Sequence, residues 1–210
     1  NWSIVTMKFL TILLVILFAA IGVKSRFFSF SSQSPKDYSQ TGPLFVLDKH
    51  LNGPILSEGL IYGPDGKVGV TFVANMMGTW DGDSGTLSES FAYSNGKTQE
   101  RNWFLKKGPG NTFTATADDI IGTAQGEVSG SSIQLKYRII LPKDSGGHTL
   151  DVTDWLYLAE NGAILNRSEM RKFGIKVAEL VATMRPDQSA VSQLAPMMNG
   201  SAEQESAPLN

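Results

Sequence analysis

Turn-forming residues recur along the middle of the chain at intervals that fit a succession of short strands. Each group separates runs of about ten residues with strand character, a spacing typical of all-β domains. The 21 glycines suit a chain with many tight turns. The groups are Gly63-Pro64-Asp65-Gly66, Asn95-Gly96, Gly108-Pro109-Gly110-Asn111, Ser129-Gly130-Ser131, Ser145-Gly146-Gly147 and Asn161-Gly162. They favour an antiparallel meander, a sandwich or a barrel.

Between the turns, apolar and polar residues alternate. In residues 133–141 the odd positions are apolar, while Gln134, Lys136 and Arg138 occupy the other face. A helix does not give this period of two. Residues 172–181 are interpreted as a strand rather than a helix, because their β-branched residues alternate with others. One helical turn is expected around Val46–Leu51.

These runs amount to about ten strands joined by short hairpins. We therefore predict an all-β fold, an antiparallel up-and-down (lipocalin-like) barrel preceded by an N-terminal hydrophobic helix. Closure removes exposed strand edges and leaves an interior lined by every second residue. A sandwich of two sheets is the alternative.

The first 25 residues have the features of an export signal. An apolar run, residues 9–23, follows Met7-Lys8, the expected translation start, and precedes Lys24 and Arg26. This pattern predicts a signal peptide or an uncleaved signal anchor. The expected organisation is a signal or anchor over 1–25, a Ser-rich linker over 26–44, a β-barrel over 45–185 and a disordered tail over 186–210. The expected location is the cell envelope, either anchored in the inner membrane and facing the periplasm or free in the periplasm.

Composition excludes several classes of function. The net charge of −2 gives no reason to expect a nucleic-acid partner. Without cysteine the chain has no disulfide, thiolate metal site or cysteine nucleophile. Its two histidines, His50 and His148, lie far apart, and the calcium-like run at residues 81–85 has Ala92 where the loop requires glutamate. We therefore predict neither a metal nor another cofactor.

Two charged residues stand on apolar strand faces. Glu89 lies in the alternation of residues 87–93, and Arg101 shares a face with Trp103. If residues 94–96 form a three-residue loop with Gly96 in the left-handed conformation, Glu89 faces Arg101 across the hairpin. A buried charge needs such a partner. We predict an inward Glu89–Arg101 pair, which is either a structural ion pair or an anchor for a ligand, with Arg101 suited to a carboxylate or phosphate.

Further inward polar and aromatic residues extend this candidate site. Asp154 lies on an apolar face of residues 150–158, and Asn166 alternates with apolar and small residues. Asp119 is interpreted as a turn or cap residue. The predicted ligand-binding set is Glu89, Arg101, Trp103, Tyr137, Asp154 and Asn166.

The motifs of residues 87–174 resemble a known family. The carrying residues are Leu87-x-Glu89-x-Phe91-x-Tyr93-x-x-Gly96, Arg101-x-Trp103, Phe113-x-Ala115-x-Ala117-x-Asp119-Ile120-Ile121-Gly122-x-Ala124-x-Gly126, Asp154-Trp155-Leu156-Tyr157-Leu158, Asn166-Arg167 and Lys172-Phe173-Gly174. They resemble the uncharacterised proteobacterial envelope family called domain of unknown function 3833, over about residues 45–184. The resemblance implies a Gram-negative source, an envelope location, a lipocalin-like barrel and no established activity. Many members look like lipoproteins, but residues 22–25 lack the lipobox cysteine.

Three functions remain open at this point. The first is a monomeric, non-enzymatic binding module for a hydrophobic or amphipathic small molecule such as a lipid or fatty acid. The second is a structural or assembly protein of the envelope, whose barrel is packed solid. The third is a hydrolase or isomerase using Glu89 or Asp154, which is disfavoured because the sequence shows no nucleophile–base pair.

Overall fold

The computed structural model describes residues 2–27 and 29–189, in two compact units that divide after Asp37. In the first unit, helix α1 (Trp2–Phe27) is followed by the short 3₁₀ helix η1 (Phe30–Ser32). The segment Ile4–Lys24 is long and apolar enough to cross a membrane, and none of it is buried. Cleaved signal peptides and signal anchors share these properties.

The second unit is built almost entirely from β-structure. The 3₁₀ helix η2 (Pro35–Tyr38) ends at Tyr38, which is the first residue of this unit. The single-turn helix α2 (Leu47–His50) precedes the strands, as the sequence predicted. The strands are β1 (Gly53–Tyr62), β2 (Val68–Asp81), β3 (Ser84–Tyr93), β4 (Thr98–Lys107), β5 (Thr112–Thr116), β6 (Ala124–Ser129), β7 (Ser132–Ile140), β8 (Thr149–Leu158), β9 (Ile164–Lys172) and β10 (Ile175–Pro186), with η3 (Lys143–Ser145) between β7 and β8.

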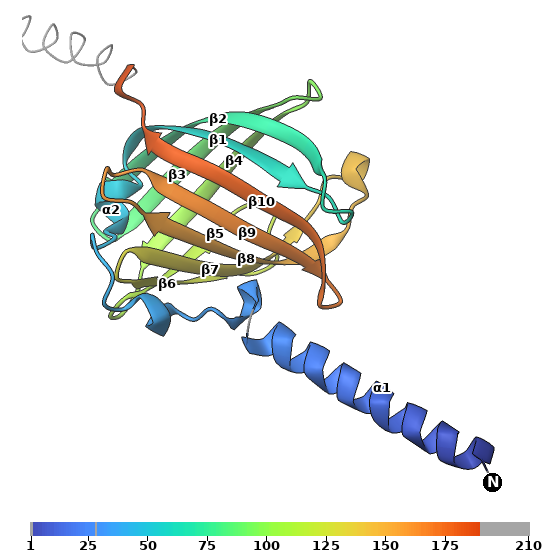
Figure 1. Cartoon of the computed structure of the whole chain (residues 1–210). Helices are drawn as coiled ribbons and strands as arrows, with labels where there is room; N and C mark the ends of the chain where they lie inside the picture. Colours follow the sequence, from blue (N-terminus) through green and yellow to red (C-terminus); the bar gives the residue numbers. More distant parts are fainter. Residues whose placement is uncertain (1, 28, 190–210) are drawn as a thin grey trace, which may run out of the picture. The chain divides into compact units, whose positions relative to one another are not determined.

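The ten strands form a single closed barrel (Figure 1). Each strand pairs antiparallel with the next in sequence, and β1 pairs with β10 to complete the ring, for example Leu60 with Val181. This confirms the predicted up-and-down barrel and excludes the sandwich. Residue 172 ends β9 and residues 175–181 lie in β10, with a turn at 173–174 between them, so the interpretation of this segment as strand rather than helix is confirmed outside the turn.

The register of the β3–β4 hairpin is the predicted one. The amide of Tyr93 donates a hydrogen bond to the carbonyl of Lys97 over 2.9 Å, so the loop has three residues. Gly96 has a φ of +83°, the left-handed conformation that glycine adopts without strain. As a result, Glu89 and Arg101 are direct partners across the two strands.

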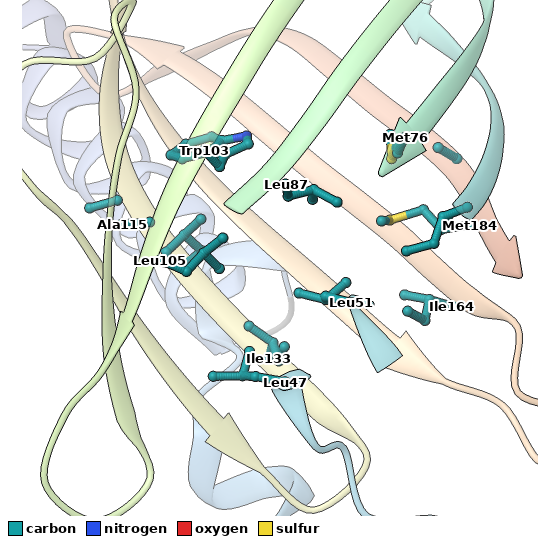
Figure 2. Packing of buried hydrophobic residues seen from close by; sticks show 14 of the residues in the cluster. Leu47, Leu51, Met76, Leu87, Trp103, Leu105, Ala115, Ile133, Ile164 and Met184 are labelled. Atoms are coloured by element: carbon teal, nitrogen blue, oxygen red, sulfur yellow. The ribbon is translucent and has the colours of Figure 1, made fainter. Parts of the chain in front are cut away.

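Helix α2 closes one end of the barrel. Leu47 and Leu51 belong to the core cluster, and Figure 2 shows them among the side chains of Leu105 and Ile133. The indole Nε1 of Trp80 donates a hydrogen bond to the carbonyl of Leu51 over 2.8 Å. A Cβ atom at position 78 would collide with that same carbonyl, so Gly78 permits the close approach of the α2 segment.

The loop of residues 117–123 extends the barrel wall at the opposite end, beyond the short strands β5 and β6. The amide of Ile121 donates to the carbonyl of Arg138 over 2.9 Å, and the amide of Ile140 donates to that of Asp119 over 2.8 Å. These bonds fix the loop along the end of β7. The ion pair of Lys97 with Asp144, at 2.7 Å, joins two further connections at this end, which we call the mouth.

The second unit contains its complete core. Every member of the core cluster lies between Phe45 and Met184. Part of the proposed linker, 26–44, packs on this unit, because the Tyr38 ring lies 5.2 Å from that of Trp155. We therefore expect residues 29–189 to fold without α1. Of the predicted tail, 186–210, Pro186 ends β10, and the part from residue 190 lies outside the described residues.

The turn between β9 and β10 contains a strained residue. Lys172 pairs with Ile175, which leaves a two-residue loop in which Phe173 has a φ of +52° and Gly174 one of +77°. Phe173 is the one non-glycine residue with positive φ in the described chain, and its side chain is 91% exposed. The two φ values fit a turn of type I′, which prefers Asn-Gly.

Replacing this residue with asparagine, Phe173→Asn, is expected to raise the free energy of unfolding by about 1 kcal/mol, because asparagine tolerates the left-handed conformation. Urea unfolding of residues 29–189 measures the change. Phe104→Asn makes the same exchange at an exposed position within β4 and should not stabilise the protein. A Phe173→Asn protein no more stable than the natural one would contradict the strain.

Candidate functional site

The barrel encloses a cavity of about 360 Å³, near the lower end of the range for small-molecule sites. Most of its lining is apolar, and all of it comes from residues 51–184. Phe72, Phe91 and Tyr93 fill part of the interior with ring contacts of 5.3–6.1 Å. The interior is therefore partly packed and partly hollow.

All six residues of the predicted ligand-binding set line this cavity. They come from five strands: Glu89 from β3, Arg101 and Trp103 from β4, Tyr137 from β7, Asp154 from β8 and Asn166 from β9. Each faces inward because the alternation places every second residue on that side. The structure also brings Asp119, Ser57 and Ser168 to the same cavity.

The charge partner of Arg101 differs from the predicted one. Its Nε donates a hydrogen bond to Oδ1 of Asp119 over 3.0 Å, and its Nη2 lies 3.0 Å from the same oxygen. Among the described residues no ion pair within 4.0 Å joins Arg101 to Glu89, although the two are register partners. The reason is the loop of residues 117–123, which carries the Asp119 carboxylate over the end of β4.

The guanidinium of Arg101 also lies against two aromatic rings. Its Cζ is 4.1 Å from the ring centre of Trp103 and 5.7 Å from that of Tyr137. The two rings meet edge to face at 5.2 Å. Burial alone would lower the pKa of Arg101, but Tyr137, Asp119 and the nearby acids outweigh it and raise the pKa, so the group stays charged.

Glu89 is 7% exposed, and its acidity is strongly perturbed. Burial raises its pKa to about 7, and the charges of Asp154 and Asp119 act in the same direction against the opposing effect of Arg101. Near neutral pH this carboxyl is therefore protonated in a large fraction of molecules.

Asp154 is the second inward acid. Burial raises its pKa, against the opposing effects of hydrogen bonds from Ser168 and Tyr137 and of the charge of Arg101. Burial, followed by the charge of Asp154, raises the pKa of Tyr137 well above its ordinary value. Two buried atoms of the cluster make no hydrogen bond of good geometry: Oδ1 of Asp154 and Nη2 of Arg101, whose 3.0 Å contact with Asp119 is an ion pair only.

Asn166 and Ser168 form the β9 side of the cluster. The Nδ2 of Asn166 donates to the carbonyl of Trp155 over 3.0 Å and to Oγ of Ser168 over 3.3 Å. Trp155 points to the other face of β8, where it stacks with Tyr157 at 6.0 Å. Asn166 is therefore largely occupied by the barrel itself.

The resulting site is acidic and apolar. Three carboxyl groups and one guanidinium are its charged groups, and neither histidine lines it. Within the described residues no three His, Cys, Asp or Glu side chains are placed to hold a metal ion. Such a site can take up an apolar molecule and contact one polar group on it.

Comparisons with known proteins identify a family without assigning an activity. A search of curated proteins gives no match. The solved structure of the S-type phycobiliprotein lyase CPES from Guillardia theta is similar with a TM-score of 0.48 and 8% sequence identity, over 74% of this chain and 98% of that chain. The family described as protein of unknown function (DUF3833) matches residues 25–186. The chain therefore belongs to the DUF3833 family.

Proposed function

We propose that the barrel binds one hydrophobic or amphipathic small molecule, such as a lipid or fatty acid. The observation that carries this proposal is the cavity of about 360 Å³, which α2 closes at one end and which combines apolar walls with a few convergent polar groups. A barrel packed solid would offer no such space. The six predicted residues are proposed as ligand contacts, with Glu89, Arg101 and Asp154 as the polar ones.

The proposed setting is the cell envelope. Supporting it is the exposed apolar segment Ile4–Lys24, acting as signal peptide or inner-membrane anchor ahead of a barrel over residues 45–185. Binding is proposed ahead of catalysis because the cavity walls are mostly apolar, while Glu89, with its pKa raised to about 7 by burial, is the lining group with the acidity of a general acid or base. A structural role remains the second candidate, supported by the packed aromatic rings of Phe72, Phe91 and Tyr93.

Native mass spectrometry of residues 29–189, produced in the periplasm and purified without detergent, tests the proposal. We expect a co-purified lipid or fatty acid at near-stoichiometric occupancy, identified by extraction. Ala178 lines the cavity, so Ala178→Phe should fill it and reduce occupancy at least about tenfold. Ala92→Phe, on the exposed face of β3, is the matched control and should keep the ligand.

Two results would count against a binding module. One is an empty domain that takes up neither a fluorescent fatty acid nor a fluorescent fatty alcohol. The other is equal occupancy in the Ala178→Phe and Ala92→Phe proteins, which would place any bound molecule outside the cavity. Either result would favour the structural role.

A further inference from the structure

We infer that the cavity selects ligands whose polar group is uncharged and both donates and accepts hydrogen bonds, as in an aliphatic alcohol or a primary amide. This inference rests on the proposed function and specifies its ligand class. It disfavours a carboxylate and an ammonium group alike.

The two unsatisfied atoms of the cluster have opposite hydrogen-bonding character. Nη2 of Arg101 can only donate, and Oδ1 of Asp154 accepts when the acid is ionised. Both residues line the cavity. Buried polar groups in proteins are nearly always hydrogen-bonded, so this pair indicates a missing partner that offers one acceptor and one donor.

Tyr137 connects these two residues into one polar cluster. Its ring centre lies 5.7 Å from the guanidinium carbon of Arg101, and burial together with the charge of Asp154 raises the pKa of its hydroxyl. Asp154 lies on β8 beside Tyr137 on β7, and it pairs with Ser168 on β9. A single polar group that enters this region therefore meets both a donor and an acceptor.

An anionic ligand is disfavoured by the surrounding charges. The positive charge of Arg101 is already held by Asp119 at 3.0 Å, and Glu89 and Asp154 add two further acids. A carboxylate placed here would meet three carboxyl groups with one guanidinium that is already paired. Like charges at short range in a poorly hydrated cavity repel strongly.

A cationic ligand is disfavoured for a different reason. Arg101 is itself a buried cation whose guanidinium is packed on Trp103 at 4.1 Å, so it stays in the cluster. The three carboxyl groups attract an ammonium group, but that group would lose its hydration on entry and would meet the charge of Arg101. It also offers no acceptor for Nη2.

The lining places the polar group in the interior and the apolar part of the ligand toward the mouth. Glu89 and Asp154 lie near the middle of their strands, whereas Ile61 and Leu180 pair with each other near the mouth. On the other side, Leu51 and Ile133 close the cavity near α2. The ligand should therefore enter with its polar group first.

A series of four ten-carbon probes tests the inference: 1-decanol, decanamide, decanoic acid and decylamine. Isothermal titration calorimetry measures their binding to delipidated residues 29–189 at pH 8 and constant ionic strength. The alcohol and the amide are expected to bind at least about tenfold more tightly than decanoate and decylammonium. The ranking requires only the natural sequence, so it stands even if a variant does not fold.

Asp154→Asn removes one of the repelling charges at constant shape. It should strengthen decanoate binding by at least about threefold and so narrow the gap to 1-decanol. The control is Asp151→Asn. Asp151 lies on β8, the strand of Asp154, but its side chain is exposed and pairs with Arg138, so all four affinities should stay unchanged. Circular dichroism verifies that both variants keep the β-sheet spectrum.

The outcomes separate this inference from the proposed function. If decanoate or decylammonium binds most tightly, the inference is overturned, while a small-molecule site in the barrel is supported. If none of the four probes binds, the proposed function fails and the inference fails with it. Tightest binding of the alcohol and amide, with the expected response to Asp154→Asn, supports both.

Discussion

Replacing Arg101 with methionine is expected to lower the free energy of unfolding at pH 8 by about 3–5 kcal/mol, the typical loss when one partner of a buried ion pair is removed. The side chain is 14% exposed and that of Asp119 is 23% exposed, so both charges are largely shielded from water. The substitution leaves the three acids of the cavity without their cation. It also removes the guanidinium from the faces of Trp103 and Tyr137.

Urea unfolding of residues 29–189 measures this loss. Arg138→Met is the matched control, because Arg138 pairs with Asp151 at 3.3 Å but both side chains are more than half exposed. That change should cost about 1 kcal/mol or less. The double variant Arg101→Met with Asp119→Asn should recover part of the loss. Equal losses for Arg101→Met and Arg138→Met would show that the inward cluster is not a buried charge pair.

Replacing Glu89 with glutamine is expected to raise the free energy of unfolding at pH 8 by about 3 kcal/mol. Burial raises the pKa of Glu89 from its ordinary value of 4.5 to about 7 in the folded protein, and each pKa unit corresponds to about 1.4 kcal/mol. Between these pH values the folded state holds a proton that the unfolded state has released. The stability that Glu89 contributes is therefore fully present below about pH 4.5 and is lost as the pH rises through 7.

Glutamine keeps the shape and stays neutral, so the natural and Glu89→Gln proteins should be similar near pH 4 and diverge by pH 8. Unfolding at a series of pH values measures the divergence. Glu160→Gln, at an exposed position in the β8–β9 hairpin, should change stability by less than about 0.5 kcal/mol. If Glu89→Gln is no more stable than the natural protein at pH 8, burial does not penalise the Glu89 charge.

The barrel and much of its inward face were predictable from sequence because both depend on local patterns. The three-residue loop at residues 94–96 fixes the register, and the register sets Glu89 opposite Arg101. Alternation then assigns each residue of the strand to the inside or the outside. For the same reason all six predicted residues line the cavity.

The partner of Arg101 was not predictable in this way. Asp119 lies in a loop, where no alternation indicates direction, and it reaches Arg101 because that loop binds the end of β7 through Ile121 and Ile140. The size of the cavity was equally impossible to predict from the sequence. It depends on how the aromatic side chains pack and on how deeply Leu47 and Leu51 enter the closed end, which are properties of the assembled barrel.

The pairing of β1 with β10 has a consequence for how this chain folds. Every other strand pair joins neighbours in sequence, whereas Glu58 and Arg185 meet across this seam from positions 127 residues apart. Local hairpins close with a small entropy cost, so the seam should form late. Weakening Glu58–Arg185 should therefore speed unfolding, whereas weakening the β3–β4 hairpin should slow folding if that hairpin forms early.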